Sequence, residues 1–212
     1  MVNLNQDTFN LLFSASVENN INLRNDNIKN WYGISYELFT DAPLNTINDF
    51  WRIVAFTYSW MPTIPTINEH LINEPVELII SLQALKAGDV DTLPALLKQL
   101  IPVINNSLIG TSKVLHFIAP DYVPIIDSNV LRGWDIFFFQ LHPDLNAPKL
   151  PHYKTSLSHS HIENYLSYKE LLHQWSFNCE RSISIREIEH LLFDLGKYTP
   201  KEKLLPIIYS LV

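Results

Sequence analysis

Apolar residues recur at helical spacing along most of this chain, and this periodicity is the feature that most constrains its fold. The clearest apolar stripe consists of Leu93, Leu96, Leu97, Leu100 and Ile101. These residues fall on one face of a helix because their spacing follows 3.6 residues per turn. Only five of the 212 residues are glycine and 47% are hydrophobic, which favours helices around a packed core over turn-rich β structure. We therefore predict an all-α chain of roughly nine or ten helices.

Local signals predict several of the helix ends. Thr46 or Asn45 is a candidate N-cap for a helix that runs to Tyr58, and Gly88 follows another helix at the position that favours glycine. Ser184 and Glu187 have the spacing of a capping box at the start of the last clear helix.

The length of the chain fits one large domain or two small ones. We expect 1–212 to form a single all-α unit, or two helical subdomains with a cleft between them. In the second case about 45–140 would form the central subdomain, and 1–44 with 141–212 the other.

The overall composition excludes several classes of protein. The net charge is −7, so the overall electrostatic field does not steer the chain to nucleic acid. Cys179 is the only cysteine, which excludes an intramolecular disulfide and an iron–sulfur cluster. No apolar run approaches the length of a membrane span, and the N-terminus lacks the features of a signal peptide. We expect a cytoplasmic protein with no membrane partner.

A proline-containing loop is expected over 142–160, and three histidines lie in it or next to it. His152, His159 and His161 could face one metal ion, but no cysteine pair or HExxH pattern accompanies them. Histidines in contact with solvent are the simpler interpretation, and no metal or cofactor is predicted. The chain has neither a serine nucleophile elbow nor a glycine-rich phosphate loop.

The stretch 110–134 contains two short helical patterns with a proline-containing connection between them. The first pattern opens at Gly110 and carries Lys113, and the second opens at Asp127. The apolar run before Asp127 contains Pro124, which argues against a strand. Asp127 could cap a helix or take part in chemistry, and Lys113 could be a nucleophile or a solvated lysine. The residue types alone favour the cap and the solvated lysine.

Trp60 and Met61 end the helix that begins near Thr46. Their apolar side chains could cover the core, or they could form a platform that faces a cleft. The first interpretation is the simpler one.

The order of these parts resembles the helix-hairpin-helix DNA glycosylases, the endonuclease III-like group, which are all-α. Residues 109–115, Ile-Gly-Thr-Ser-Lys-Val-Leu, are similar to the end of the family's hairpin. Residues 123–132, Val-Pro-Ile-Ile-Asp-Ser-Asn-Val-Leu-Arg, are similar to its aspartate segment. The resemblance extends over about 45–140.

The resemblance implies a DNA glycosylase of DNA repair, which cleaves the N-glycosidic bond of a flipped damaged or modified base. Asp127 would stabilise the cationic sugar, and Lys113 would match the lysine that forms a Schiff base in some members. The resemblance also implies a set of residues that contact DNA: Gly110, Thr111 and Ser112 in the hairpin, Arg132 after the aspartate, and Trp60 and Met61 at the opened duplex.

A second hypothesis is a non-catalytic helical protein with the same scaffold, which binds nucleic acid or a protein partner. In this case Asp127 is only a helix cap. The acidic charge favours this hypothesis, and so does Ser112, which stands where the family's hairpin has its second glycine.

Overall fold

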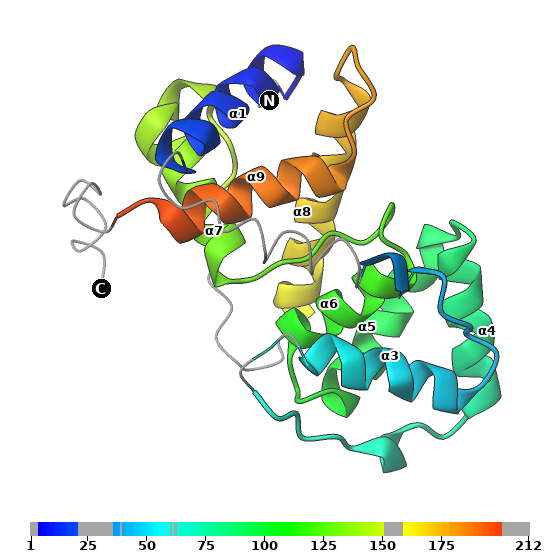
Figure 1. Ribbon diagram of the computed structural model, residues 1–212. Helices are drawn as coiled ribbons and strands as arrows, with labels where there is room; N and C mark the ends of the chain where they lie inside the picture. Colours follow the sequence, from blue (N-terminus) through cyan, green and yellow to red (C-terminus); the bar gives the residue numbers. More distant parts are fainter. Residues whose placement is uncertain are drawn as a thin grey trace. The chain divides into compact units, whose positions relative to one another are not determined.

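The computed structural model describes residues 4–20, 36–38, 40–59, 61, 63–150 and 159–200 (Figure 1). Their regular structure is helical, which confirms the all-α expectation, and the isolated bridge between Ile67 and Ile104 is the one β contact in these ranges. The α-helices are α1 (Gln6–Asn20), α3 (Ile47–Ser59), α4 (Pro75–Lys86), α5 (Leu93–Val103), α6 (Leu108–Ile118), α7 (Ser128–Asp135), α8 (His159–Phe177) and α9 (Ile185–Tyr198). Short 3₁₀ helices are η1 (Glu69–Leu71), η2 (Val90–Thr92) and η4 (Pro143–Leu145), and η3 (Ile136–Leu141) is a π-helix.

The helices belong to two compact units. One contains α1, α7, η3, η4, α9 and the part of α8 from Glu170 onward, and the other contains α3 to α6 with α8 up to Lys169. The chain passes from the second unit to the first between Ile126 and Asp127. No helix in the described part of the chain is both long enough and apolar enough to cross a membrane.

The core of the unit with α3 to α6 is built on the predicted apolar stripe of α5. All five stripe residues are at most 2% exposed. Helix α3 begins as predicted, since Thr46 and Asp49 cap it reciprocally: Asp49 Oδ2 accepts from the Thr46 amide at 2.9 Å, and the Asp49 amide donates to Thr46 Oγ1 at 3.3 Å. The hydrogen bond from the Thr46 hydroxyl is the main cause that lowers the pKa of Asp49.

The other unit is organised by the crossing of α7 and α9, with α1 packed on α9 as well (Figure 1). The two helices touch through Gly133 and Gly196. A Cβ on Gly133 would lie 1.8 Å from the carbonyl oxygen of Leu192, and a Cβ on Gly196 would lie 1.9 Å from that of Asn129. This contact requires glycine because any side chain would collide with backbone.

Several predicted helix ends are confirmed. Gly88 follows α4 with a φ of 100°, a left-handed conformation that favours glycine, and Ser184 and Glu187 form the capping box of α9. The loop expected over 142–160 contains η4, and α8 begins at His159. The apolar end of the sequence also predicts a short helix over 200–212, but 201–212 lie outside the described residues.

Candidate functional site

Asp127 is the N-cap of α7, as one of the two interpretations of the sequence predicts. Its Oδ1 accepts from the amide of Asn129 at 2.9 Å and from the amide of Val130 at 3.0 Å. The side chain is half-buried, so its carboxylate is fixed in direction without being enclosed. Two amides and the positive end of the helix dipole favour a negative charge at this position.

The segment before Asp127, 123–126, is buried and has no regular secondary structure, and it pairs with no strand in the described part of the chain. Its first residue, Val123, is fully buried, and the carbonyl oxygen lies 2.7 Å from Nδ1 of the buried His116. At the other end of the segment, the Ile126 amide donates to Ser112 Oγ at the longer distance of 3.4 Å. Side chains of α6 therefore meet polar groups that a sheet would otherwise pair.

Two tyrosines of α8 meet the carbonyl groups in the middle of the same segment. The hydroxyl of Tyr165 donates to the Pro124 oxygen at 2.7 Å, and that of Tyr168 donates to the Ile125 oxygen at 3.3 Å. Both tyrosines are fully buried. The prediction that 123–126 is not a strand is confirmed, and its three successive carbonyls at 123–125 all meet buried side chains.

The first helix of the central stretch begins earlier than expected. Its N-cap is Ser107, whose Oγ accepts from the Gly110 amide at 3.0 Å, so Gly110 lies in the first turn of α6 and does not open it. The side chains of Thr111 and Ser112 are fully buried. DNA could contact these two side chains, as predicted, only if the residues that cover them moved away.

Gly110 is needed here for a close approach to Tyr58 of α3. A Cβ on Gly110 would lie 2.1 Å from the tyrosine hydroxyl oxygen. That hydroxyl is buried and has no hydrogen-bond partner among the described residues. Burial raises the pKa of Tyr58 to about 12, because the charged phenolate would lose its hydration.

Lys113 is the sixth residue of α6 and is half-buried. It belongs to the unit with α3 to α6, whereas Asp127 belongs to the other unit. The sequence also leads us to expect that Lys113 and Asp127 face one cleft, and this stays a prediction.

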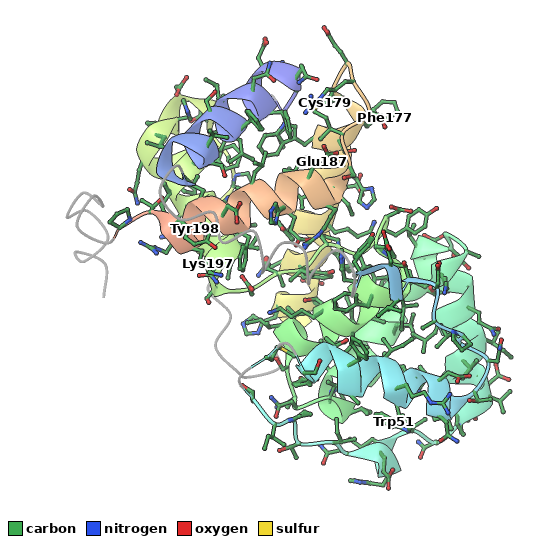
Figure 2. All side chains as sticks on the ribbon, viewed as in Figure 1. Trp51, Phe177, Cys179, Glu187, Lys197 and Tyr198 are labelled. Carbon is green, nitrogen blue, oxygen red and sulfur yellow. The ribbon has the colours of Figure 1, made fainter. Side chains whose placement is uncertain are left out.

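Arg132 is engaged within its own unit. One guanidinium nitrogen donates to the carbonyl of Gly196 and the other to that of Thr199, each at 2.7 Å. Arg132 therefore caps the C-terminal end of α9, which ends near Lys197 and Tyr198 (Figure 2). Its predicted contact with DNA would have to replace these bonds or use the remaining donors of the guanidinium.

Met61 lies beside a hollow between α3 and the following segment, while Trp60 lies outside the described residues. The hollow has a volume of about 570 Å³, and no charged residue lines it. The lining residues on α3 include Trp51, which Figure 2 labels. Met61 is half-buried, and its contact with DNA stays a prediction.

The histidine cluster considered in the sequence is only partly visible. His161 is half-buried in α8, whereas His152 and the side chain of His159 lie outside the described residues. Among the residues that the structure describes, no group of three or more His, Cys, Asp or Glu side chains could hold a metal ion. Cys179 is half-buried after α8 (Figure 2), and burial is the main cause that raises the pKa of its thiol.

Sequence reasoning did not find His116, Tyr165 or Tyr168 as parts of the site. The two tyrosines lie 41 and 43 residues from the carbonyls to which they donate, and no local pattern joins residues so far apart. Pro124 was the one feature of the sequence that pointed to such partners. An extended proline segment that cannot join a ladder needs other partners for its carbonyls when it is buried.

No match to this chain was found among protein-family models, curated proteins or solved structures.

Proposed function

We propose that this chain is a DNA glycosylase-like protein that cleaves the N-glycosidic bond of a flipped damaged or modified base, with Asp127 as the reacting carboxylate. The observation that supports it is how hydrogen bonds hold the Asp127 carboxylate and the residues before it. Its half-buried carboxylate is oriented by two amides, and the residues directly before it are held by buried side chains. A DNA partner and a cytoplasmic location are parts of the same proposal.

In the proposed reaction the bond between the sugar carbon and the base nitrogen breaks, and its electron pair leaves with the base. The sugar is left with a positive charge, which Asp127 stabilises. Two unit charges 4 Å apart attract by about 4 kcal/mol at an effective dielectric constant of about 20. This corresponds to roughly a thousandfold in rate if the attraction exists only in the transition state. Water then attacks the sugar carbon, and its proton passes to the departing base.

Lys113 offers an alternative nucleophile. If its neutral amine attacked the sugar carbon in place of water, the resulting adduct would rearrange to a Schiff base. Reduction with borohydride makes such an adduct permanent. The proposal therefore includes Lys113 as the second residue of the site.

The contacts with DNA are not assigned to Thr111, Ser112 or Arg132 in this proposal. The first two side chains are fully buried and the third donates to α9 carbonyls. The same observations, together with the net charge of −7, favour the second candidate function. In it the chain is a non-catalytic helical protein that binds nucleic acid or a protein partner, and Asp127 only caps α7.

The two candidates are separated by incubating the protein with single- and double-stranded DNA that carries a panel of damaged or modified bases. Release of a base by the wild type, and its loss in Asp127→Asn, supports the glycosylase. The proposal is abandoned if the wild type releases no base from any substrate. Lys113→Met is tested with borohydride: loss of a covalent adduct assigns the amine, and an adduct that persists removes Lys113 from the mechanism.

A further inference from the structure

Capping of α7 accounts for two hydrogen bonds of the Asp127 carboxylate but not for the contacts of the residues before it. The segment 123–126 is at most 9% exposed at Val123, Ile125 and Ile126. Buried carbonyl groups need hydrogen-bond partners, and side chains from two helices meet them here. We propose that Tyr165 and Tyr168, with His116, are positioning residues: by holding the segment 123–126 they fix the position of Asp127.

The spacing of the two tyrosines fixes the register of the segment. Tyr165 and Tyr168 are three residues apart, so they lie on the same face of α8 and about 4.5 Å apart along its axis. They donate to the carbonyls of two successive residues, Pro124 and Ile125, which are spaced by about 3.3 Å in an extended chain. A slip of one residue would break both of these hydrogen bonds and move Asp127 by about 3.3 Å.

Such a slip matters for chemistry and not for a cap. Asp127 could still bond the amides of Asn129 and Val130, because they belong to the same short segment of chain. A reacting group misplaced by about 1 Å, in contrast, costs about a hundredfold in rate. The inference therefore rests on the proposed function, since positioning has a kinetic consequence only if Asp127 reacts.

The first test compares Tyr165→Phe, Tyr168→Phe and the double variant with Tyr58→Phe. The control is matched because Tyr58 is also a buried tyrosine of the same unit, but its hydroxyl has no hydrogen-bond partner among the described residues. We expect the single-turnover rate of base release to fall about 10-fold in each single variant and about 100-fold in the double variant. The affinity for DNA should change less than about twofold, and the control should keep the wild-type rate.

A conservative replacement of His116 provides a rescue. His116→Asn keeps a nitrogen donor near the position of Nδ1, which lies 2.7 Å from the Val123 carbonyl oxygen. His116→Leu removes the donor. We expect the asparagine variant to retain most of the rate and the leucine variant to lose about 10-fold. Equal rates in these two variants would remove His116 from the positioning group.

A second measurement keeps this inference separate from the proposed function. Hydrogen exchange of the Val123 and Ile126 amides is followed in the free protein, and we expect it to be at least about 10-fold faster in the double tyrosine variant, because local opening of the segment becomes easier. If the wild type releases no base, the proposed function fails, and so does the kinetic role of the tyrosines, but faster exchange would retain their role in holding the segment. If the wild type is active and the tyrosine variants keep its rate, the positioning inference is overturned and the proposed function stands.

Discussion

The starts of α6 and α7 use the same local chemistry but differ in how deeply the turn after the cap is buried. Ser107 caps α6 by accepting from one amide, and Asp127 caps α7 by accepting from two. Both caps are half-buried, but the residues after them differ: Gly110 and Thr111 of α6 are buried, whereas Ser128 of α7 is exposed. A reacting group needs access to its substrate. The more exposed first turn of α7 therefore supports the proposal that the chemistry lies there, although the sequence presents two similar helix starts.

Each of these helices also contains a glycine under close contact, and the contacts differ in kind. Gly110 in α6 meets the side-chain hydroxyl of Tyr58, and Gly133 in α7 meets the backbone oxygen of Leu192. A side chain can move or be shortened by substitution, whereas a helix backbone cannot. A side chain added at the crossing of α7 and α9 should therefore destabilise the protein more than one added at the contact of α3 with α6.

The largest effect on stability is expected for Gly133→Ala. The new Cβ would lie 1.8 Å from the Leu192 oxygen, so α7 and α9 must separate. We expect the free energy of unfolding to fall by about 3 kcal/mol or more, measured by urea denaturation. A loss below about 1 kcal/mol would show that the two helices do not cross this closely.

Gly110→Ala should have a smaller effect, and this effect should be reversible by a second substitution. The Cβ would lie 2.1 Å from the Tyr58 hydroxyl oxygen and 3.1 Å from the ring carbon that carries it. We expect a loss of about 2 kcal/mol in free energy of unfolding. Most of this loss should be recovered when Gly110→Ala is combined with Tyr58→Phe. A double-mutant cycle measures this coupling, and additive losses would contradict the contact.

Arg132→Met tests whether Arg132 serves α9 or DNA. Removal of two bonds to the carbonyls of Gly196 and Thr199 should lower the free energy of unfolding by about 1.5 kcal/mol. The salt dependence of DNA binding should not change. If Arg132 instead contacts a phosphate, the slope of log affinity against log salt concentration falls by about one.

Ser107→Ala should lower the free energy of unfolding by about 1 kcal/mol, because the Gly110 amide loses its acceptor. Ser107→Asp is the matched control, since aspartate caps a helix about as well as serine. Thermal unfolding of the two variants separates the loss of a cap from a general intolerance of substitution at this position.

The sequence was sufficient to predict the helices that carry strong local signals. The apolar stripe of α5, the cap of α3 at Thr46 and the capping box of α9 at Ser184 each depend on residues within one or two turns. The start of α6 was predicted at Gly110, three residues too late, although Ser107 is the better N-cap residue.

The surroundings of the candidate site could not be predicted in the same way. The sequence identified Asp127 and both of its possible roles. It did not identify Tyr165 and Tyr168, because their partners at Pro124 and Ile125 are brought to them only by the fold. It also gave no sign that the Arg132 side chain bonds to carbonyls 64 and 67 residues away.

The smallest effect on stability is expected for Asp127→Asn, and this substitution tests the central claim most directly. Asparagine caps helices about as well as aspartate, so the free energy of unfolding should stay within about 0.5 kcal/mol of the wild type. It cannot supply the negative charge, so the single-turnover rate of base release should fall about 100-fold or more. A variant with unchanged stability and a wild-type rate would contradict the account and leave Asp127 as a helix cap alone.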